Sequence, residues 1–208
     1  MFNKSLFDRI CNVTCSFDEL QDFVADINKK EFDLDNAFKK YYDVNKILLA
    51  IEKYQSQEID AKYLAYWMNA YNWIIMGGFD QGQWEEGLTL KEFLIWTIVD
   101  WIDGLSFFDI GFHHDLEKYK TVFKVLDSVL QDLDDCTAVF TENSYDDNTI
   151  VLITNDNAKY FIKVYGDLDD DGLLDCEKVE FDDLTNKVEE LRQLGYQELK
   201  YTDWNPDK

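Results

Sequence analysis

The residues of this chain with the clearest capacity for chemistry are aspartates in one short stretch, GDLDDDGLLD, at positions 166–175. They alternate around a glycine in the spacing Asp-x-Asp-x-Asp-Gly-x-x-Asp. Calcium takes roughly six to eight hard oxygen ligands, and alternate residues of a tightly turned loop can direct their carboxylates to one centre. The spacing therefore predicts a Ca²⁺ site. Its predicted ligands are the carboxylates of Asp167, Asp169, Asp171 and Asp175 and the main-chain carbonyl of Leu173.

This stretch resembles the first nine positions of an EF-hand loop. It resembles more closely the shorter calcium loops that join strands in integrin-type propeller domains, since one predicted strand leads in and another leads out. An EF-hand would carry a bidentate glutamate at its twelfth position, where this chain has Lys178. The resemblance therefore implies the shorter loop. The alternative is a solvated hairpin turn, in which aspartate and glycine are favoured for conformational reasons.

Other candidates for catalysis or metal binding are weaker. His113 and His114 are adjacent and would point in different directions on a helix, whereas Asp115 suits a helix N-cap. The four cysteines have neither zinc-ligand spacing nor the pattern of a disulfide framework. The sequence contains no glycine-rich phosphate loop and no nucleophile elbow. We therefore predict that the protein is not an enzyme and has no catalytic residues.

Charge is the strongest signal in the composition. Forty-three acidic residues against 20 basic ones give a net charge of −23, while 46% of the residues are hydrophobic, as in a folded protein. Residues 1–133 carry −10 and the shorter segment 134–208 carries −13. Such a surface repels nucleic acid and anionic membranes and attracts cations or a basic protein. The alternative role of the charge is solubility, or adaptation to a salt-rich habitat.

The N-terminal residues lack the apolar core of a signal peptide, and the cysteine usage suits a reducing compartment. We therefore expect a cytoplasmic protein that binds no membrane.

The first two-thirds of the chain is predicted to be helical. Capping boxes at Ser16–Glu19 and Thr89–Glu92 start two helices, and Asp60 is a suitable N-cap for a third. Another helix is expected from about Asp115, with a regular apolar stripe. Glycines are predicted to end two of these helices, at Gly77-Gly78 and at Gly104.

After residue 135 the pattern becomes that of strands. Short β-branched and aromatic segments separated by turn residues predict strands at 137–141, 149–154, 158–165 and 176–181. A final helix is expected over 183–194, ending at Gly195. The predicted fold class is α+β: a helical bundle at 1–135, then an acidic antiparallel sheet with a helix at 136–208, packed as one compact unit.

The helix after Asp60 is unusually aromatic and is apolar on two sides. The interpretation we favour is a buried central helix. In the alternative interpretation, its exposed aromatic side chains anchor a protein partner, because such rings bury a large area with little loss of rotamer freedom. The candidate anchors are whichever of Tyr63, Tyr66 and Trp73 are exposed.

The segment Leu49–Trp67 reads as a helix, a polar turn containing Glu-Ile, and a second helix. It is similar to bacterial immunity proteins of the colicin D immunity type and to those paired with contact-dependent or polymorphic nuclease toxins. The resemblance implies a cytoplasmic antitoxin that binds a basic toxin domain and covers its active site. The alternatives are a calcium-binding structural or adhesive module that uses the 167–175 loop, a phage DNA mimic that inhibits a host defence enzyme, and a metal-dependent hydrolase.

Overall fold

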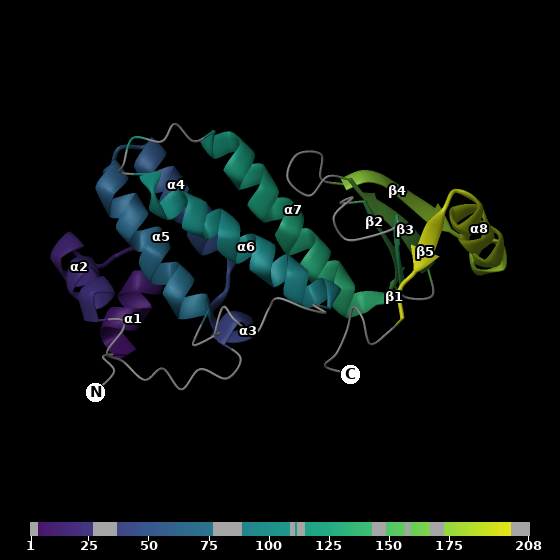
Figure 1. Cartoon of the computed structure of the whole chain (residues 1–208), viewed down its shortest axis with the longest axis horizontal. Helices are drawn as coiled ribbons and strands as arrows, with labels where there is room; N and C mark the ends of the chain where they lie inside the picture. Colours follow the sequence, from purple (N-terminus) through teal and green to yellow (C-terminus); the bar gives the residue numbers. More distant parts are fainter. Residues whose placement is uncertain are drawn as a thin grey trace. The chain divides into compact units, whose positions relative to one another are not determined.

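The computed structural model describes residues 4–26, 37–76, 89–108, 111, 115–142, 149–156, 159–166 and 173–200. These residues form eight helices and five strands in an α+β arrangement, which confirms the predicted fold class (Figure 1). The helices are α1 (Lys4–Cys11), α2 (Phe17–Asp26), α3 (Ala37–Tyr41), α4 (Val44–Gln55), α5 (Ala61–Met76), α6 (Leu90–Ser106), α7 (Leu116–Asp135) and α8 (Phe181–Gln193). The strands are β1 (Cys136–Glu142), β2 (Ile150–Asp156), β3 (Lys159–Tyr165), β4 (Leu173–Val179) and β5 (Tyr196–Glu198).

The chain divides into two compact units. Residues 1–85 and 95–120 form the first, and residues 86–94 and 121–208 form the second. The boundary therefore differs from the change from helices to strands after residue 135, because most of α7 belongs to the same unit as the sheet.

Both predicted capping boxes are present. Ser16 Oγ accepts the Glu19 amide at 3.2 Å, and Glu19 Oε2 accepts the Ser16 amide at 2.9 Å. At the start of α6, Thr89 Oγ1 accepts the Glu92 amide at 3.3 Å and the glutamate returns the bond to the Thr89 amide at 2.8 Å. Each pair satisfies two backbone donors that the first helical turn would otherwise leave without partners.

The predicted N-caps are also confirmed, whereas one predicted helix end is wrong. Asp60 Oδ1 accepts the Tyr63 amide at 2.8 Å, and Asp115 caps α7 in the same way. We predicted that the helix of α6 would stop at Gly104, but it continues to Ser106. A Cβ at Gly104 would lie 3.0 Å from the hydroxyl of Tyr119, so this glycine permits close packing of the two helices. Gly77-Gly78 lies outside the described residues.

The centre of the first unit is α5, against which α1, α2, α3 and α4 all pack. Trp67 and Tyr71 are fully buried and stacked, with ring centroids 4.7 Å apart. Trp67 Nε1 donates to the carbonyl of Ile10 at 2.7 Å, and Tyr71 Oη donates to the carbonyl of Tyr41 at 2.9 Å. These bonds attach α1 and the end of α3 to the central helix, which confirms the interpretation that we favoured for this segment.

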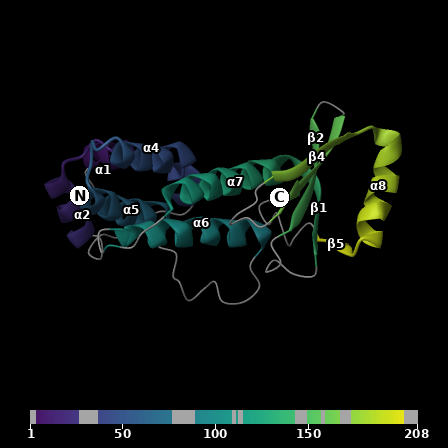
Figure 2. The same ribbon diagram turned by 90° about the horizontal axis from the view of Figure 1, so that it is seen from above.

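The second unit contains a five-stranded antiparallel sheet in the order β4-β3-β2-β1-β5. The helix α8 lies along one face of it (Figure 2) and contributes Leu191 to the core below. Residues on both faces of β2 are buried from Ile150 to Thr154.

Two details of this sheet differ from the prediction. The strand expected over 176–181 ends at Val179, and Phe181 instead begins α8 with 68% of its surface exposed. The short strand β5 was not predicted. It follows Gly195, whose φ of +100° allows the turn after α8.

Candidate functional site

The described part of α5 presents one narrow outward stripe in an otherwise buried helix. Its residues follow alternating steps of four and three, which is the spacing of a single helix face. They are Lys62, Tyr66, Asn69, Trp73 and Met76. This α5 stripe is where a partner could contact the aromatic helix.

The three predicted anchors differ in their exposure. Trp73 is 45% exposed, Tyr66 is half-buried, and Tyr63 is only 9% exposed. Tyr63 faces the interior. Because only exposed aromatic residues were candidates, Tyr63 is not an anchor. Trp73 and Tyr66 remain as candidates, one helical repeat of seven residues apart on the same face.

The α5 stripe combines aromatic, cationic and amide groups. The ring of Tyr66 packs edge-on against Phe17, with centroids 5.3 Å apart. Lys62 Nζ lies 5.1 Å from the Phe17 centroid. Between Tyr66 and Trp73, Asn69 Oδ1 is buried and accepts no hydrogen bond from the described residues. A buried acceptor without a donor lowers the stability of the fold.

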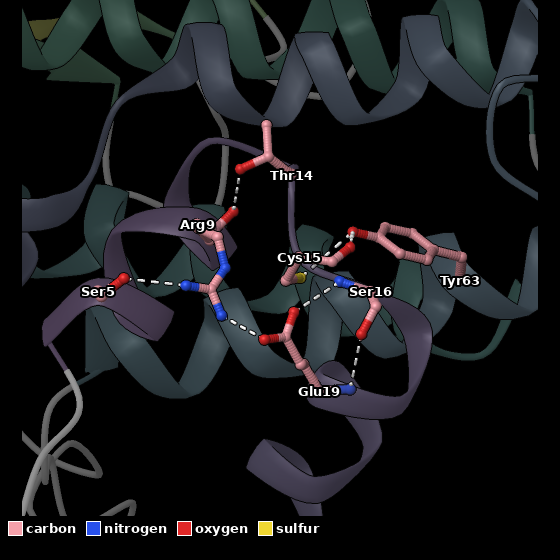
Figure 3. A network of polar contacts seen from close by, with 7 residues as sticks. All are labelled: Ser5, Arg9, Thr14, Cys15, Ser16, Glu19 and Tyr63. Atoms are coloured by element: carbon pink, nitrogen blue, oxygen red, sulfur yellow. Dashed lines mark hydrogen bonds and ion pairs between the residues drawn. The ribbon is translucent and has the colours of Figure 1, made fainter.

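Tyr63 belongs to a polar network that holds the start of α2 against α5 (Figure 3). Its hydroxyl donates to the Cys15 carbonyl at 2.8 Å and lies 3.3 Å from the Cys15 thiol. Arg9 forms an ion pair with Glu19, the acid of the capping box, and donates to Ser5 Oγ at 2.9 Å. The hydrogen bond from the Ser16 amide, followed by the bond from Arg9, lowers the pKa of Glu19. This network holds the start of α2 against α1 and α5.

Raising the pH above about 9 is expected to destabilise the protein. Burial raises the pKa of the Cys11 thiol from 9.0 to about 11, and burial also raises the pKa values of Tyr63, Tyr71 and Tyr165 above 10.0. The unfolded chain releases these protons first, so stability is complete below the unfolded pKa values and falls as the pH rises through the folded ones.

The urea midpoint measured from pH 7.5 to pH 10.5 would test this expectation. The midpoint should begin to fall near pH 9, because burial raises the pKa values of the Cys11 and Cys15 thiols in the folded state. In the double variant Cys11→Ala with Cys15→Ala, the decline should begin closer to pH 10, where the tyrosines begin to differ between the two states. A midpoint that stays constant to pH 10.5 would contradict it.

A second, partly buried polar contact joins α7 to the sheet. Asp132 Oδ1 lies 2.7 Å from Lys163 Nζ, and its Oδ2 accepts the Tyr165 hydroxyl at 2.6 Å. Burial, followed by the carboxylate of Asp132, raises the pKa of Tyr165. Both oxygens of one carboxylate are thus engaged by neighbouring residues of β3. The sequence offered no signal for this contact among its many acidic residues.

The acidic surface of the second unit is formed by β4 and α8. Residues 173–193 contain seven acidic and three basic side chains, and all seven acids are exposed. The bases are engaged within the surface: Lys178 pairs with Glu180, Lys187 with Glu177 and Glu190, and Arg192 with Glu189 and Glu198. Asp182 and Asp183, in the first turn of α8, form no ion pair among the described residues. We call residues 173–193 the β4–α8 surface.

Only part of the predicted calcium loop can be placed. Asp167, Asp169 and Asp171 lie outside the described residues, as do His113 and His114. Leu173 and Asp175 are exposed at the start of β4, and Asp175 Oδ1 accepts the Cys176 amide at 2.8 Å. A strand precedes and a strand follows this stretch, as predicted, but β4 begins at Leu173 and not at 176. Leu173 and Asp175 therefore lie within the strand, opposite Tyr165 and Val164 of β3. In the part of the chain that the structure describes, no cluster of three or more histidine, cysteine or acidic side chains could hold a metal ion.

No helix within the described ranges is both long and apolar enough to cross a membrane. Comparison of the chain with protein-family models, with curated proteins and with solved structures gives no match.

Proposed function

We propose that this protein is a non-enzymatic, cytoplasmic immunity protein that binds a basic, nuclease-type toxin domain and covers its active site. The observation that supports this proposal best is the β4–α8 surface. Its basic side chains are neutralised by neighbouring acids, so it presents a net negative charge to an approaching molecule. A toxin that binds nucleic acid presents the complementary charge.

Two kinds of contact contribute to binding in this proposal. Exposed carboxylates steer the partner and raise the association rate in a salt-dependent way. Exposed aromatic groups, of which Trp73 is the best candidate, exclude water after contact and slow dissociation.

The proposal is tested by measuring the association and dissociation rate constants of a basic partner. The partner is the basic nuclease domain encoded beside this gene. If the neighbouring genes encode none, basic proteins captured from the native lysate take its place. The association rate constant should fall at least tenfold between 50 and 500 mM salt. The double substitution Asp182→Asn with Asp183→Asn should lower that rate constant severalfold, whereas Trp73→Ala should raise the dissociation rate constant about tenfold.

A matched control removes the same number of negative charges from a different helix. Asp18 and Asp22 are exposed acids of α2, and Asp18, like Asp182, lies in the first turn of its helix. Asp18→Asn with Asp22→Asn should leave the association rate nearly unchanged. Equal effects of the two double variants would show that only net charge acts, and the absence of any salt-dependent basic partner would refute the proposal.

A calcium-binding module is the second candidate function, and the position of the aspartate-rich stretch between β3 and β4 favours it. We expect calorimetric titration to detect one Ca²⁺ with a dissociation constant on the order of millimolar, as in extracellular modules. Asp171→Ala should abolish the heat of binding, whereas Asp156→Ala, at the end of β2, should not. If no heat of binding is detected up to several millimolar Ca²⁺, this candidate function is eliminated.

A further inference from the structure

The strand β4 forms one outer edge of the sheet, at the opposite end from β5. It is seven residues long and, among the described residues, pairs only with β3. An edge strand carries a row of backbone amide and carbonyl groups that can accept another strand. Proteins often shorten such edges, interrupt them with proline or protect them with charges and bulges. β4 is neither short nor interrupted by proline, but it carries charged side chains and an irregularity in its pairing with β3.

One hydrogen bond identifies which amides face outward. The Cys176 N–H donates to Asp175 Oδ1 at 2.8 Å, so it is directed to the side chain of its neighbour. In an antiparallel strand, successive residues direct their amides alternately to the two edges. The geometry places the Cys176 amide at the outer edge, and the amide of Lys178, two residues later, shares its direction. These are the donors that an added strand would meet.

Exposed apolar side chains stand near the two ends of β4. Leu173 begins β4 and is 50% exposed, and Phe181 follows its last residue by two positions and is 68% exposed. The Phe181 ring contacts Tyr160 of β3, with centroids 5.9 Å apart, so it lies towards β3 and not at the free edge. A strand laid along β4 would therefore cover Leu173, and apolar area removed from water stabilises such a complex.

Charge selects the occupant of this edge. In an antiparallel pairing of two copies centred on Cys176, Asp175 would lie directly across from Glu177 of the second copy, and like charges in such pairs are destabilising. The net charge of −23 also opposes self-association. A strand with basic residues at alternate positions would instead place cations opposite both acids.

We propose that β4 is a strand-addition site, at which an extended basic segment of the partner pairs with the sheet as its sixth strand. This inference rests on the proposed function and specifies its mode of contact. Backbone hydrogen bonds supply part of the affinity, and alternate side chains supply the selectivity, as in other interactions of this kind. The carboxylate of Asp175 releases the Cys176 amide when a partner carbonyl replaces it.

The test uses the full chain and a synthetic nine-residue peptide of alternating lysine and valine. At saturation the peptide should slow hydrogen exchange at the Cys176 and Lys178 amides at least tenfold, with little effect at Glu177, whose amide faces β3. A control peptide with the same sequence and charge, N-methylated at every backbone amide, cannot donate to β4 from either edge and should bind at least tenfold more weakly.

A protein variant provides an independent test. Proline is tolerated at edge positions whose amide faces solvent, so Cys176→Pro should fold and lose peptide binding. If that variant fails to fold, the comparison with the N-methylated peptide decides whether strand addition occurs. Equal binding by both peptides would overturn strand addition and leave the charge-driven proposal standing. Binding of neither peptide would overturn strand addition, and the salt series with the nuclease domain would then decide the proposed function separately.

Discussion

Replacing Trp67 with alanine is expected to lower the free energy of unfolding by about 3–5 kcal/mol. Trp67 is fully buried in α5, stacks on Tyr71 and donates its indole N–H to the carbonyl of Ile10. The substitution removes the packing of a large ring and also leaves that carbonyl with one bond fewer, so both effects act in the same direction. Urea unfolding followed by circular dichroism measures the loss.

The same helix supplies the control. Trp73 lies six residues further along α5, is 45% exposed and contributes to the α5 stripe. Trp73→Ala should cost less than about 1 kcal/mol, because less of its surface is removed from water on folding. Similar losses in the two variants would show that α5 is not the centre of the first unit. The Trp73 variant also separates binding from stability, since it should weaken partner binding in a protein that still folds.

Asp132→Ala is expected to destabilise the second unit by about 2 kcal/mol. The substitution removes the acceptor of both Lys163 Nζ and the Tyr165 hydroxyl, and both groups are partly or fully shielded from water. Asp132→Asn should cost roughly half as much, because the amide oxygen still accepts one of the two bonds while the charge is lost. Thermal unfolding of the original protein and the two variants at pH 7 would measure this order of stability.

Asp134 is the matched control for this variant. It lies two residues away on α7, and its side chain is 66% exposed beside Lys91, from which it is 3.2 Å distant. Exposed ion pairs contribute about 0–1 kcal/mol, so Asp134→Ala should have a small effect. Equal losses at positions 132 and 134 would contradict the assignment of Asp132 as the contact between α7 and β3.

Features encoded by a few neighbouring residues could be predicted from the sequence. The starts of α2 and α6 are given by Ser16 with Glu19 and by Thr89 with Glu92, whose bonds span only three residues. The strands β1, β2 and β3 follow from β-branched segments between turn residues. Such local signals determine the fold class before any tertiary contact is known.

Features that depend on distant residues could not be predicted. Gly104 was expected to end a helix, but its role is set by Tyr119 on another helix. Phe181 continues an apolar alternation with Val179, although the chain has already turned into α8. The three residues of β5 have no periodicity of their own and become a strand only by pairing with β1.

The candidate site shows the same limit. Both sides of α5 are apolar, so periodicity alone does not distinguish the buried Tyr63 from the exposed Trp73. Nor does it single out Asp132, one of 43 acidic residues, as the carboxylate that meets β3. Only the packing of neighbouring elements separates residues that hold the fold from those that can face a partner.

The position of β5 also has a consequence for the order in which the chain is built. The other three strand pairs join consecutive strands, whereas β5 pairs with β1, and Phe140 lies opposite Glu198, 58 residues later. During synthesis the ribosome releases β1 to β4 first, and they can form a meander through short loops. β5 covers residues Phe140 to Glu142 of β1 only after α8 has emerged. In a nascent chain this edge of β1 therefore stays unpaired until β5 has left the exit tunnel, and this interval is when β1 is most exposed to aggregation.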